Sequence, residues 1–129
     1  MTDYRRHDAT LTITMASVKI DRDDPLPLHE QVAAAIRRAI SDGEAKPGER
    51  LPPARDLAAV LGVNSNTVLR ALRLLRDEGL LEFRRGRGVR VVGTPEKGAV
   101  IKQARDLIDF ARHNGIKRDE LLDLIQSLP

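Results

Sequence analysis

The residues best suited to chemistry with an anionic partner are the arginines of positions 83–89, which read Phe-Arg-Arg-Gly-Arg-Gly-Val. Arg84, Arg85 and Arg87 surround Gly86 in a glycine turn that is too tight to be buried. Their mutual repulsion destabilises the free protein slightly, and an anion that neutralises them removes this cost. The minor groove of duplex DNA attracts arginine and admits a narrow hairpin, so DNA is the expected target. The alternative is a turn that only increases solubility.

A second group of polar side chains begins a helix expected over residues 64–78. Asn64 is expected to cap this helix by accepting a hydrogen bond from the backbone N–H of Thr67. The inward stripe of the helix consists of four apolar residues, Val68, Ala71, Leu72 and Leu75. The stripe leaves short polar groups and one cation exposed at the start of the helix, namely Ser65, Asn66, Thr67 and Arg70.

Such side chains can recognise base edges in a major groove, and residues four apart, such as Asn66 and Arg70, share one helical face. The N-terminus of the helix can also donate backbone N–H groups to a phosphate. We therefore expect this helix to contact DNA. The alternative is that residues 64–67 are only a cap and its first turn.

Two further helices are expected before this one, each with a start and a stop signal. Pro27 suits the start of the first helix and Asp42-Gly43 its end, and apolar residues recur at every fourth position, Leu28, Val32, Ile36 and Ile40. Pro53 begins the second helix and Gly62 closes it, with three buried positions, Leu57, Ala58 and Leu61. These helices are expected to support the one over residues 64–78.

A two-stranded hairpin follows Gly79, which ends the helix over residues 64–78. Apolar residues alternate with polar ones on both sides of a loop that holds Gly86 and Gly88: Leu81, Phe83, Val89 and Val91. Leu51 is expected to add a short β-bridge. The order of elements predicts a mainly α fold with a small β-wing, in which residues 20–93 form a winged helix-turn-helix head.

The last 36 positions, residues 94–129, are expected to form a two-helix C-terminal dimerisation tail. One helix follows Thr94-Pro95 and ends at Asn114-Gly115, and the other covers about residues 118–127. This pair is too small to bury its own apolar stripe, so it must pack on the head or on a second copy of the chain. We expect a homodimer formed through Ile101, Ala104, Leu107, Ile108, Leu121, Leu122 and Ile125. Residues 1–19 are expected to be a partly flexible N-terminal arm with a weak strand over residues 11–20.

Composition and charge agree with this organisation. The net charge is +3, and the excess lies in residues 54–92, which hold eight arginines and four acidic residues. With two Phe, one Tyr and no Trp the core must be aliphatic. The chain has no cysteine, no membrane-length apolar run and no secretory signal pattern, so we expect a cytoplasmic protein.

Enzymatic signatures are weak. The histidines at positions 7, 29 and 113 lie far apart in sequence and match no nucleophile or metal-ligand spacing. Asp106, Asp109 and His113 share a helical face, which could in principle bind a metal, but such a trio is more often a solvated surface. The Gly86-x-Gly88 pair lies in a hairpin and no helix follows it, so it is no phosphate loop. We expect no enzymatic activity, no cofactor and no metal.

Four separated motifs resemble the GntR family of bacterial transcription regulators. They are Pro-Leu-His-Glu-Gln at 27–31, Gly-Glu-Arg-Leu-Pro-Pro-Ala-Arg-Asp-Leu-Ala at 48–58, Val-Asn-Ser-Asn-Thr-Val at 63–68 and Arg-Gly-Arg-Gly at 85–88. The family signature Leu-Pro-Ser-x-Arg-x-Leu-Ala has Pro53 in place of its serine here, and Arg55 is retained. The short helical tail resembles the YtrA-like subfamily.

The resemblance implies a transcription regulator, most often a repressor, that binds an inverted-repeat operator as a homodimer. It implies that Arg55 contacts the phosphate backbone, that residues 64–67 and Arg70 enter the major groove, and that residues 85–87 form the wing tip. Many relatives carry an arginine in the first turn of the recognition helix, where Ser65 stands here. Two alternatives stay open: a sequence-indifferent architectural DNA binder, and a winged-helix module for protein interactions.

A small-molecule effector is a further possible partner, of unknown identity. Larger members of the family carry an effector domain of more than a hundred residues, whereas about 35 residues follow the wing here. These are too few to enclose a typical pocket of about 300 Å³ within one chain. An effector would have to bind between subunits or between head and tail.

Overall fold

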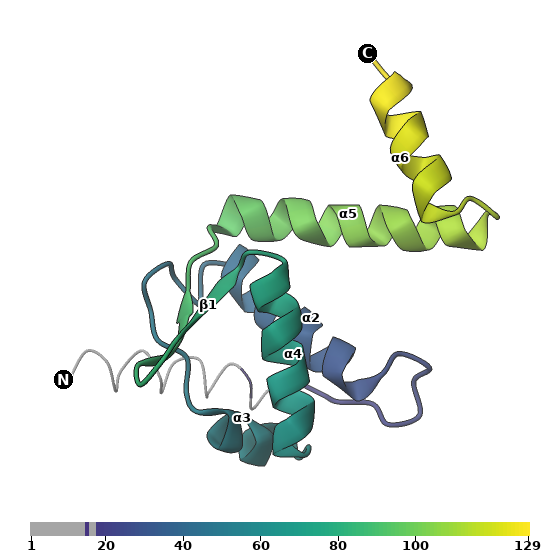
Figure 1. The fold of residues 1–129 in the computed structure, drawn as a ribbon. Helices are drawn as coiled ribbons and strands as arrows, with labels where there is room; N and C mark the ends of the chain where they lie inside the picture. The colour runs from purple at the N-terminus through teal and green to yellow at the C-terminus, as the bar shows by residue number, and fades with distance from the viewer. Residues whose placement is uncertain (1–14, 16–17) are drawn as a thin grey trace.

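The computed structural model describes Met15 and residues 18–129, which form helices and one two-stranded antiparallel sheet (Figure 1). This confirms the predicted mainly α fold with a small β-wing. In chain order the elements are α2 (Leu28–Ser41), α3 (Ala54–Leu61), α4 (Ser65–Asp77), β1 (Leu81–Arg84), β2 (Gly88–Val91), α5 (Pro95–His113) and α6 (Arg118–Ser127).

The bounds of α2 and α3 follow from their caps, as predicted. Pro27 and Pro53 occupy the N-cap positions with extended ψ angles of 147° and 149°. Gly62 ends α3 in the left-handed conformation, with φ of +69°, and its N–H group donates to the carbonyl of Ala58. Both helices turn apolar residues inward, including Val32, Ile36, Ile40, Leu57 and Leu61.

Helix α4 has the predicted inward stripe, in which Val68, Ala71, Leu72 and Leu75 are buried. Asn64 is its N-cap, as predicted, and its side chain accepts from the backbone N–H of Asn66 at 2.8 Å. The prediction that this side chain accepts from Thr67 is wrong. The reason is that the N–H group of Thr67 donates to the backbone carbonyl of Asn64 at 3.0 Å. The cap thus satisfies two of the free N–H groups at this end of the helix.

The hairpin pairs Leu81 with Val91 and Phe83 with Val89, and its turn covers residues 85–87. Gly88, expected in the loop, instead begins β2 opposite Arg84. The predicted β-bridge exists one residue away from Leu51, between Arg50 and Arg90. Two backbone bonds flank that bridge, from Leu51 N–H to Val89 O at 2.8 Å and from Val91 N–H to Glu49 O at 2.9 Å.

The N-terminal stretch differs from expectation. Within the weak strand predicted over residues 11–20, the structure describes only Met15 and residues 18–20. Met15 is helical and fully buried in the aliphatic core, and residues 18–20 form no strand. The N–H group of Val18 donates to the carbonyl of Met15 at 3.1 Å, a local turn bond, so this N–H group is not available to a strand partner. The rest of the predicted arm lies outside the described residues.

A buried ion network joins three helices. The guanidinium of Arg37 on α2 donates to both carboxylate oxygens of Glu78, the C-cap of α4, at 2.8 and 2.7 Å. Arg105 on α5 contacts the same carboxylate at 3.1 Å and reaches Glu30 at 3.6 Å. The side chains of Arg37 and Glu78 are 7% and 13% exposed, so water screens this pair little. The C-terminal end of α4 is therefore held to α2 and to the tail.

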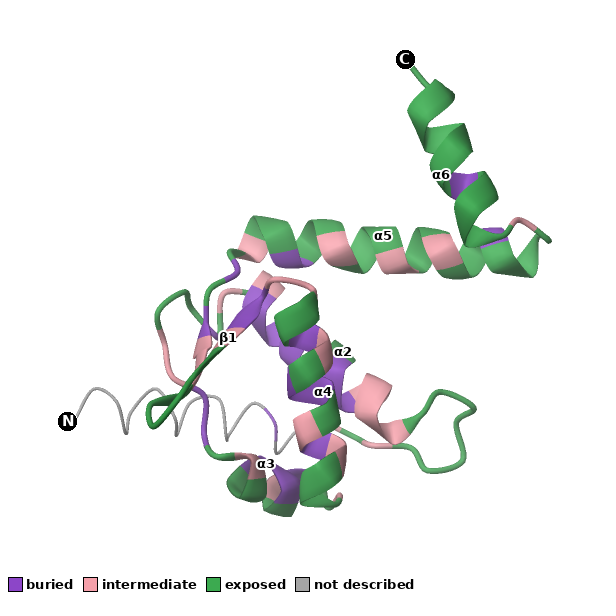
Figure 2. Cartoon of the chain, in the orientation of Figure 1, coloured by how far each residue is buried: buried purple, intermediate pink, exposed green. Residues whose placement is uncertain are grey.

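Helix α5 lies across one end of the head, and α6 extends away from it (Figure 1). Thr94 caps α5 by accepting from the N–H group of Lys97 at 3.1 Å. Gly98 brings α5 close to α2, since a Cβ atom there would lie 3.4 Å from Ile40 and from the backbone of Ser41. Beyond that contact most of the tail surface is exposed (Figure 2), including large apolar side chains: Val100, Leu107, Phe110, Leu122, Leu124, Ile125 and Leu128.

The ion network makes a prediction about stability. Arg37→Ala leaves the largely buried Glu78 carboxylate with Arg105 as its one remaining partner, so the free energy of unfolding should fall by about 3 kcal/mol. The measurement is urea denaturation at fixed protein concentration. Arg38→Ala, at the adjacent exposed position, is the control and should change it by less than about 0.5 kcal/mol. Equal effects of the two substitutions would contradict the importance assigned to the network.

Candidate nucleic-acid interface

The first turn of α4 presents the polar side chains that the sequence predicted. Ser65, Asn66 and Arg70 are exposed and Thr67 is half-buried. Asn64 is also exposed, but its side-chain oxygen is occupied by the cap. Within the described part of the chain, the side chains of Ser65, Asn66 and Arg70 form no hydrogen bond or ion pair. They are therefore available to an external partner.

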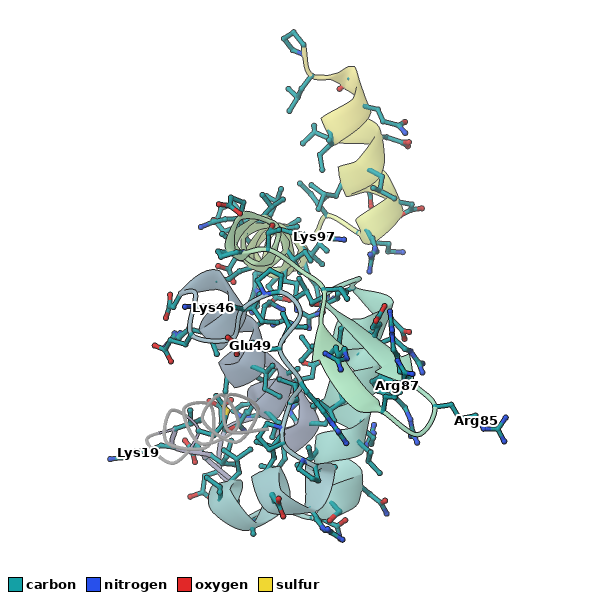
Figure 3. The ribbon with its side chains drawn as sticks, turned by 90° about the vertical axis from the view of Figure 1, so that its left-hand side faces the viewer. Lys19, Lys46, Glu49, Arg85, Arg87 and Lys97 are labelled. Carbon is teal, nitrogen blue, oxygen red and sulfur yellow. The ribbon has the colours of Figure 1, made fainter. Side chains whose placement is uncertain are left out.

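The wing presents a second cationic group. Arg85 projects outward from the hairpin turn, and Arg87 lies on the same turn (Figure 3). Neither side chain has an ion pair or hydrogen bond to any described residue. Arg84 differs, because its guanidinium donates to Glu82 at 2.6 Å, which partly neutralises it. The free cations of the wing are thus at its turn.

The turn itself depends on a glycine conformation. Gly86 has φ of +73°, a value that favours glycine, and the N–H group of Arg87 donates to the carbonyl of Arg84 at 2.9 Å. No described atom other than the chain neighbours would lie within 4 Å of a Cβ atom on Gly86. Gly86 therefore allows the backbone to make the turn, and the space around this residue is open to a partner.

The base of the wing is fixed to the head by the segment before α3. The N–H group of Gly48 donates to Val91 O at 2.7 Å, and the Arg90 guanidinium donates back to Gly48 O at 2.9 Å. Together with the Arg50–Arg90 bridge, these bonds hold β2 along the head. The turn can therefore project while its base stays in place.

Three arginines beyond the predicted set lie beside the wing or on α4. A Cβ atom on Gly88 would lie 2.8 Å from Nε of Arg50, so the Arg50 side chain runs against the hairpin backbone. Arg76 on α4 lies over the Phe83 ring, 4.9 Å from its centroid, within range of a cation–π interaction. Arg73 is exposed and three residues from Arg70, so these two cations share a face of α4. The three-residue spacing of Arg70 and Arg73 is visible in the sequence and could have identified Arg73. The position of Arg50 beside the wing is visible only in the folded chain.

Arg55 lies in the first turn of α3, where its side chain is 84% exposed. Its ion pair with Asp56 is long, at 3.9 Å, and exposed ion pairs contribute little to stability. A phosphate could therefore displace Asp56 at small cost. In Figure 1 the first turns of α3 and α4 and the hairpin turn all lie on the side of the head away from α5 and α6.

The tail residues predicted for dimerisation divide into two groups. Leu121 is buried, while Ile101 and Ile108 are half-buried, and Ile101 packs against the core of its own head. The others are exposed: Ala104, Leu107, Leu122 and Ile125. Only the second group is free to meet a second copy of the chain.

The polar face of α5 is arranged as a set of local ion pairs. Asp106 pairs with Lys102 at 2.9 Å and Asp109 with Arg112 at 3.6 Å, and a ring nitrogen of His113 bonds to the backbone carbonyl of Asp109. Over Met15 and residues 18–129, no group of three or more His, Asp or Glu side chains is placed to hold a metal ion. Nor does any helix there have the length and apolarity needed to cross a membrane.

Comparisons with known proteins identify the family of this chain. Residues 28–91 match the family described as "Bacterial regulatory proteins, gntR family". The HTH-type transcriptional repressor YtrA of Bacillus subtilis is 31% identical over 118 residues, covering 86% of this chain and 91% of that protein. The HTH-type transcriptional regulator Rv1152 of Mycobacterium tuberculosis is 30% identical over 113 residues, covering 87% and 93%. These relatives are transcription regulators, which confirms the expectation that the protein is not an enzyme.

Solved structures with a similar fold include YtrA from Sulfolobus acidocaldarius, a GntR-family transcription factor. It is 36% identical with a TM-score of 0.56, and the match covers 70% of this chain and 96% of that one. BusR of S. agalactiae, in complex with its busAB-promotor DNA, has a TM-score of 0.52 and covers 78% of this chain and 54% of that one. At 23% identity this second likeness shows the fold alone. The predicted resemblance to the YtrA-like subfamily is confirmed.

The free cations of the wing generate a prediction about salt dependence. The double variant Arg85→Gln, Arg87→Gln should bind operator and random duplex more weakly by a similar factor, because phosphate contacts carry no sequence information. The slope of log affinity against log salt should become shallower by about 2 per chain. Fluorescence anisotropy at four salt concentrations measures both quantities.

Lys46→Gln is the matched control, because Lys46 is exposed and projects from the opposite side of the view in Figure 3. It should leave the affinity and the slope unchanged. An unchanged slope in the wing variant, or an equal change in the control, would remove the wing from the interface.

Proposed function

Because the chain belongs to the GntR family of bacterial regulatory proteins, which bind DNA and regulate transcription, we propose that it is a homodimeric repressor acting on an inverted-repeat operator. The observation that carries this proposal is the pairing of unpartnered arginines at the wing turn with the exposed polar first turn of α4. The name of the Bacillus subtilis relative, a transcriptional repressor, supports the direction of regulation. The proposed location is the cytoplasm, where the DNA lies.

The proposed roles follow from the chemistry of each side chain. Asn66 and Arg70 would contact base edges in the major groove, assisted by Asn64, Ser65 and Thr67. Arg55 would contact a phosphate. The wing would lie along the minor groove and its flanking phosphates through Arg84, Arg85, Gly86 and Arg87. Glu82 competes for Arg84, so we assign Arg84 a smaller share than Arg85 and Arg87.

The proposed dimer is supported by the exposed apolar surface of the tail. Leu107 is 42% exposed, Leu122 53% and Ile125 46%, and Phe110 adds a larger ring that is 68% exposed. Large apolar patches on a small protein usually mark an interaction site. We assign dimerisation to residues 94–129 and DNA binding to residues 20–93. The predicted arm over residues 1–19 contains Met15, which packs in the core of the head. A two-fold dimer would place its two recognition helices in major grooves about one DNA turn, or 34 Å, apart.

The experiment that tests the proposal is a selection of genomic DNA fragments bound by the full chain at two salt concentrations. A repressor with an inverted-repeat operator should enrich a few fragments that share a two-fold symmetric motif, more strongly at the higher salt concentration. Transcription from an enriched promoter in vitro should fall when the protein is added. Uniform recovery of fragments at both concentrations would favour the architectural alternative, and no recovery would favour the protein-interaction module.

Base recognition by α4 generates a prediction that separates specific from non-specific binding. Asn66→Ala should weaken binding to the selected operator by about 1–3 kcal/mol, because the amide is free to bond a base edge, and should affect random duplex much less. Competition titrations at one salt concentration measure both affinities. Gln126→Ala, on the tail, is the control for the loss of an exposed amide without a hydrogen bond in the described structure, and it should change neither affinity. Equal losses on operator and random DNA would contradict base recognition by Asn66.

The tail generates a prediction about assembly. The double variant Leu122→Asp, Ile125→Asp should sediment as a monomer where the unmodified chain sediments as a dimer, because charged groups at a buried apolar contact lack partners. Its operator affinity should fall and its circular dichroism should be unchanged, since both side chains are exposed in the single chain. Gln126→Asp, at an exposed position of the same helix, should remain dimeric. A variant that stays dimeric would refute this assignment of the interface.

A further inference from the structure

A cleft lies between the N-terminal part of α2 and the C-terminal half of α5, and the DNA interface does not use it. Its volume is about 700 Å³, within the range of small-molecule sites. The segment Pro25–Pro27 borders it on one side, and Arg118 at the start of α6 on another. Head and tail therefore both contribute to its walls.

The walls of the cleft carry an excess of positive charge. The lining includes six Arg and Lys side chains, from α2, α5 and α6, and three carboxylates, those of Glu30, Asp106 and Asp109. Arg38 and Arg118 form no ion pair or hydrogen bond through their side chains with any residue in the described ranges. The Arg112–Asp109 ion pair is 3.6 Å long, with side chains 73% and 63% exposed. Because exposed ion pairs contribute little to stability, an anion with a higher charge can replace Asp109 at little cost.

These observations define the chemistry of a ligand. Guanidinium groups bind phosphate and carboxylate oxygens through paired N–H donors, and such charge-assisted bonds are the stronger class of hydrogen bond. The guanidinium groups of Arg38, Arg112 and Arg118 come from three helices and line one cleft. A ligand needs more than one negative charge to pair with all of them. We propose that the α2–α5 cleft binds a small molecule with at least two negative charges, such as a phosphorylated or polycarboxylate metabolite.

The cleft is also connected to the recognition helix. Arg105 lines the cleft and contacts Glu78, the C-cap of α4, and Glu30 on α2. A polyanion competes with both carboxylates for this guanidinium, which weakens the link from α5 to the end of α4. In the proposed dimer the orientation of α5 sets the spacing of the two heads, so ligand binding should lower operator affinity. This second step rests on the proposed function, whereas the binding site does not.

Direct binding is tested by isothermal titration calorimetry of the full chain with inorganic pyrophosphate and, separately, with citrate, at an ionic strength held constant with KCl. We expect saturable binding of at least one probe with one site per chain. Pyrophosphate alone would indicate a phosphorylated ligand and citrate alone a polycarboxylate. The double variant Arg38→Gln, Arg118→Gln, the cleft variant, should bind the probe at least tenfold more weakly. Its fold should be intact, because neither side chain has a partner in the described structure.

The matched control is Arg85→Gln, Arg87→Gln, which removes two cations from the wing and none from the cleft. It should bind the probe as the unmodified chain does. The proposal is overturned if neither probe binds, if the cleft variant binds the probe normally, or if the wing variant loses probe binding. The last result would show that the probe binds at the DNA interface instead of the cleft.

Coupling is tested by operator affinity at saturating probe against KCl of equal ionic strength. Affinity should fall at least fivefold for the unmodified chain and be unchanged for the cleft variant. Linkage requires the probe to bind the operator complex more weakly by the same factor. Normal probe binding with unchanged operator affinity would overturn the coupling. The calorimetry needs no DNA, so its outcome is separate from that of the proposed function.

Discussion

The structure depends on the packing of one side of α4 against α2 and α3. Val68, Ala71, Leu72 and Leu75 must face inward, and burying a Val or Leu side chain stabilises the fold by about 1.5–3 kcal/mol. Turning the helix about its axis would expose these groups and bury Asn66 or Arg70, which costs about 1–3 kcal/mol or more for each unsatisfied polar group. The hydrophobic effect therefore decides which side chains α4 exposes at its surface.

The other end of α4 connects that surface to the rest of the protein. Glu78 accepts from Arg37 of α2 and from Arg105 of α5, so one carboxylate links the end of α4 both to α2 and to the tail. A buried bidentate pair is sensitive to the loss of either partner. This makes the network a suitable point of control, because a competitor for Arg105 acts on tail and recognition helix together.

Much of the fold and of the candidate site could be predicted, because local signals specify them. Prolines, glycines and the apolar stripes gave the bounds of α2 and α3, and the separated motifs indicated the family. The sequence did not reveal contacts between distant residues, such as Arg37 with Glu78 and Arg50 with the hairpin. No local pattern distinguishes a guanidinium that will be buried from one that will be free. At Met15 and residues 18–20, the described part of the strand expected over residues 11–20, there is no strand, because an apolar stretch of that length is compatible with either a strand or a helical turn.

The central claim is that the first turn of α4 and the wing turn contact one DNA duplex at the same time. Amide hydrogen exchange of the protein, free and bound to its selected operator, tests this most directly. The account predicts slower exchange on binding at residues 64–70 and 84–88 together, with little change over residues 44–47 on the far side of the head. Slower exchange at only one of the two segments, or at neither, would contradict it.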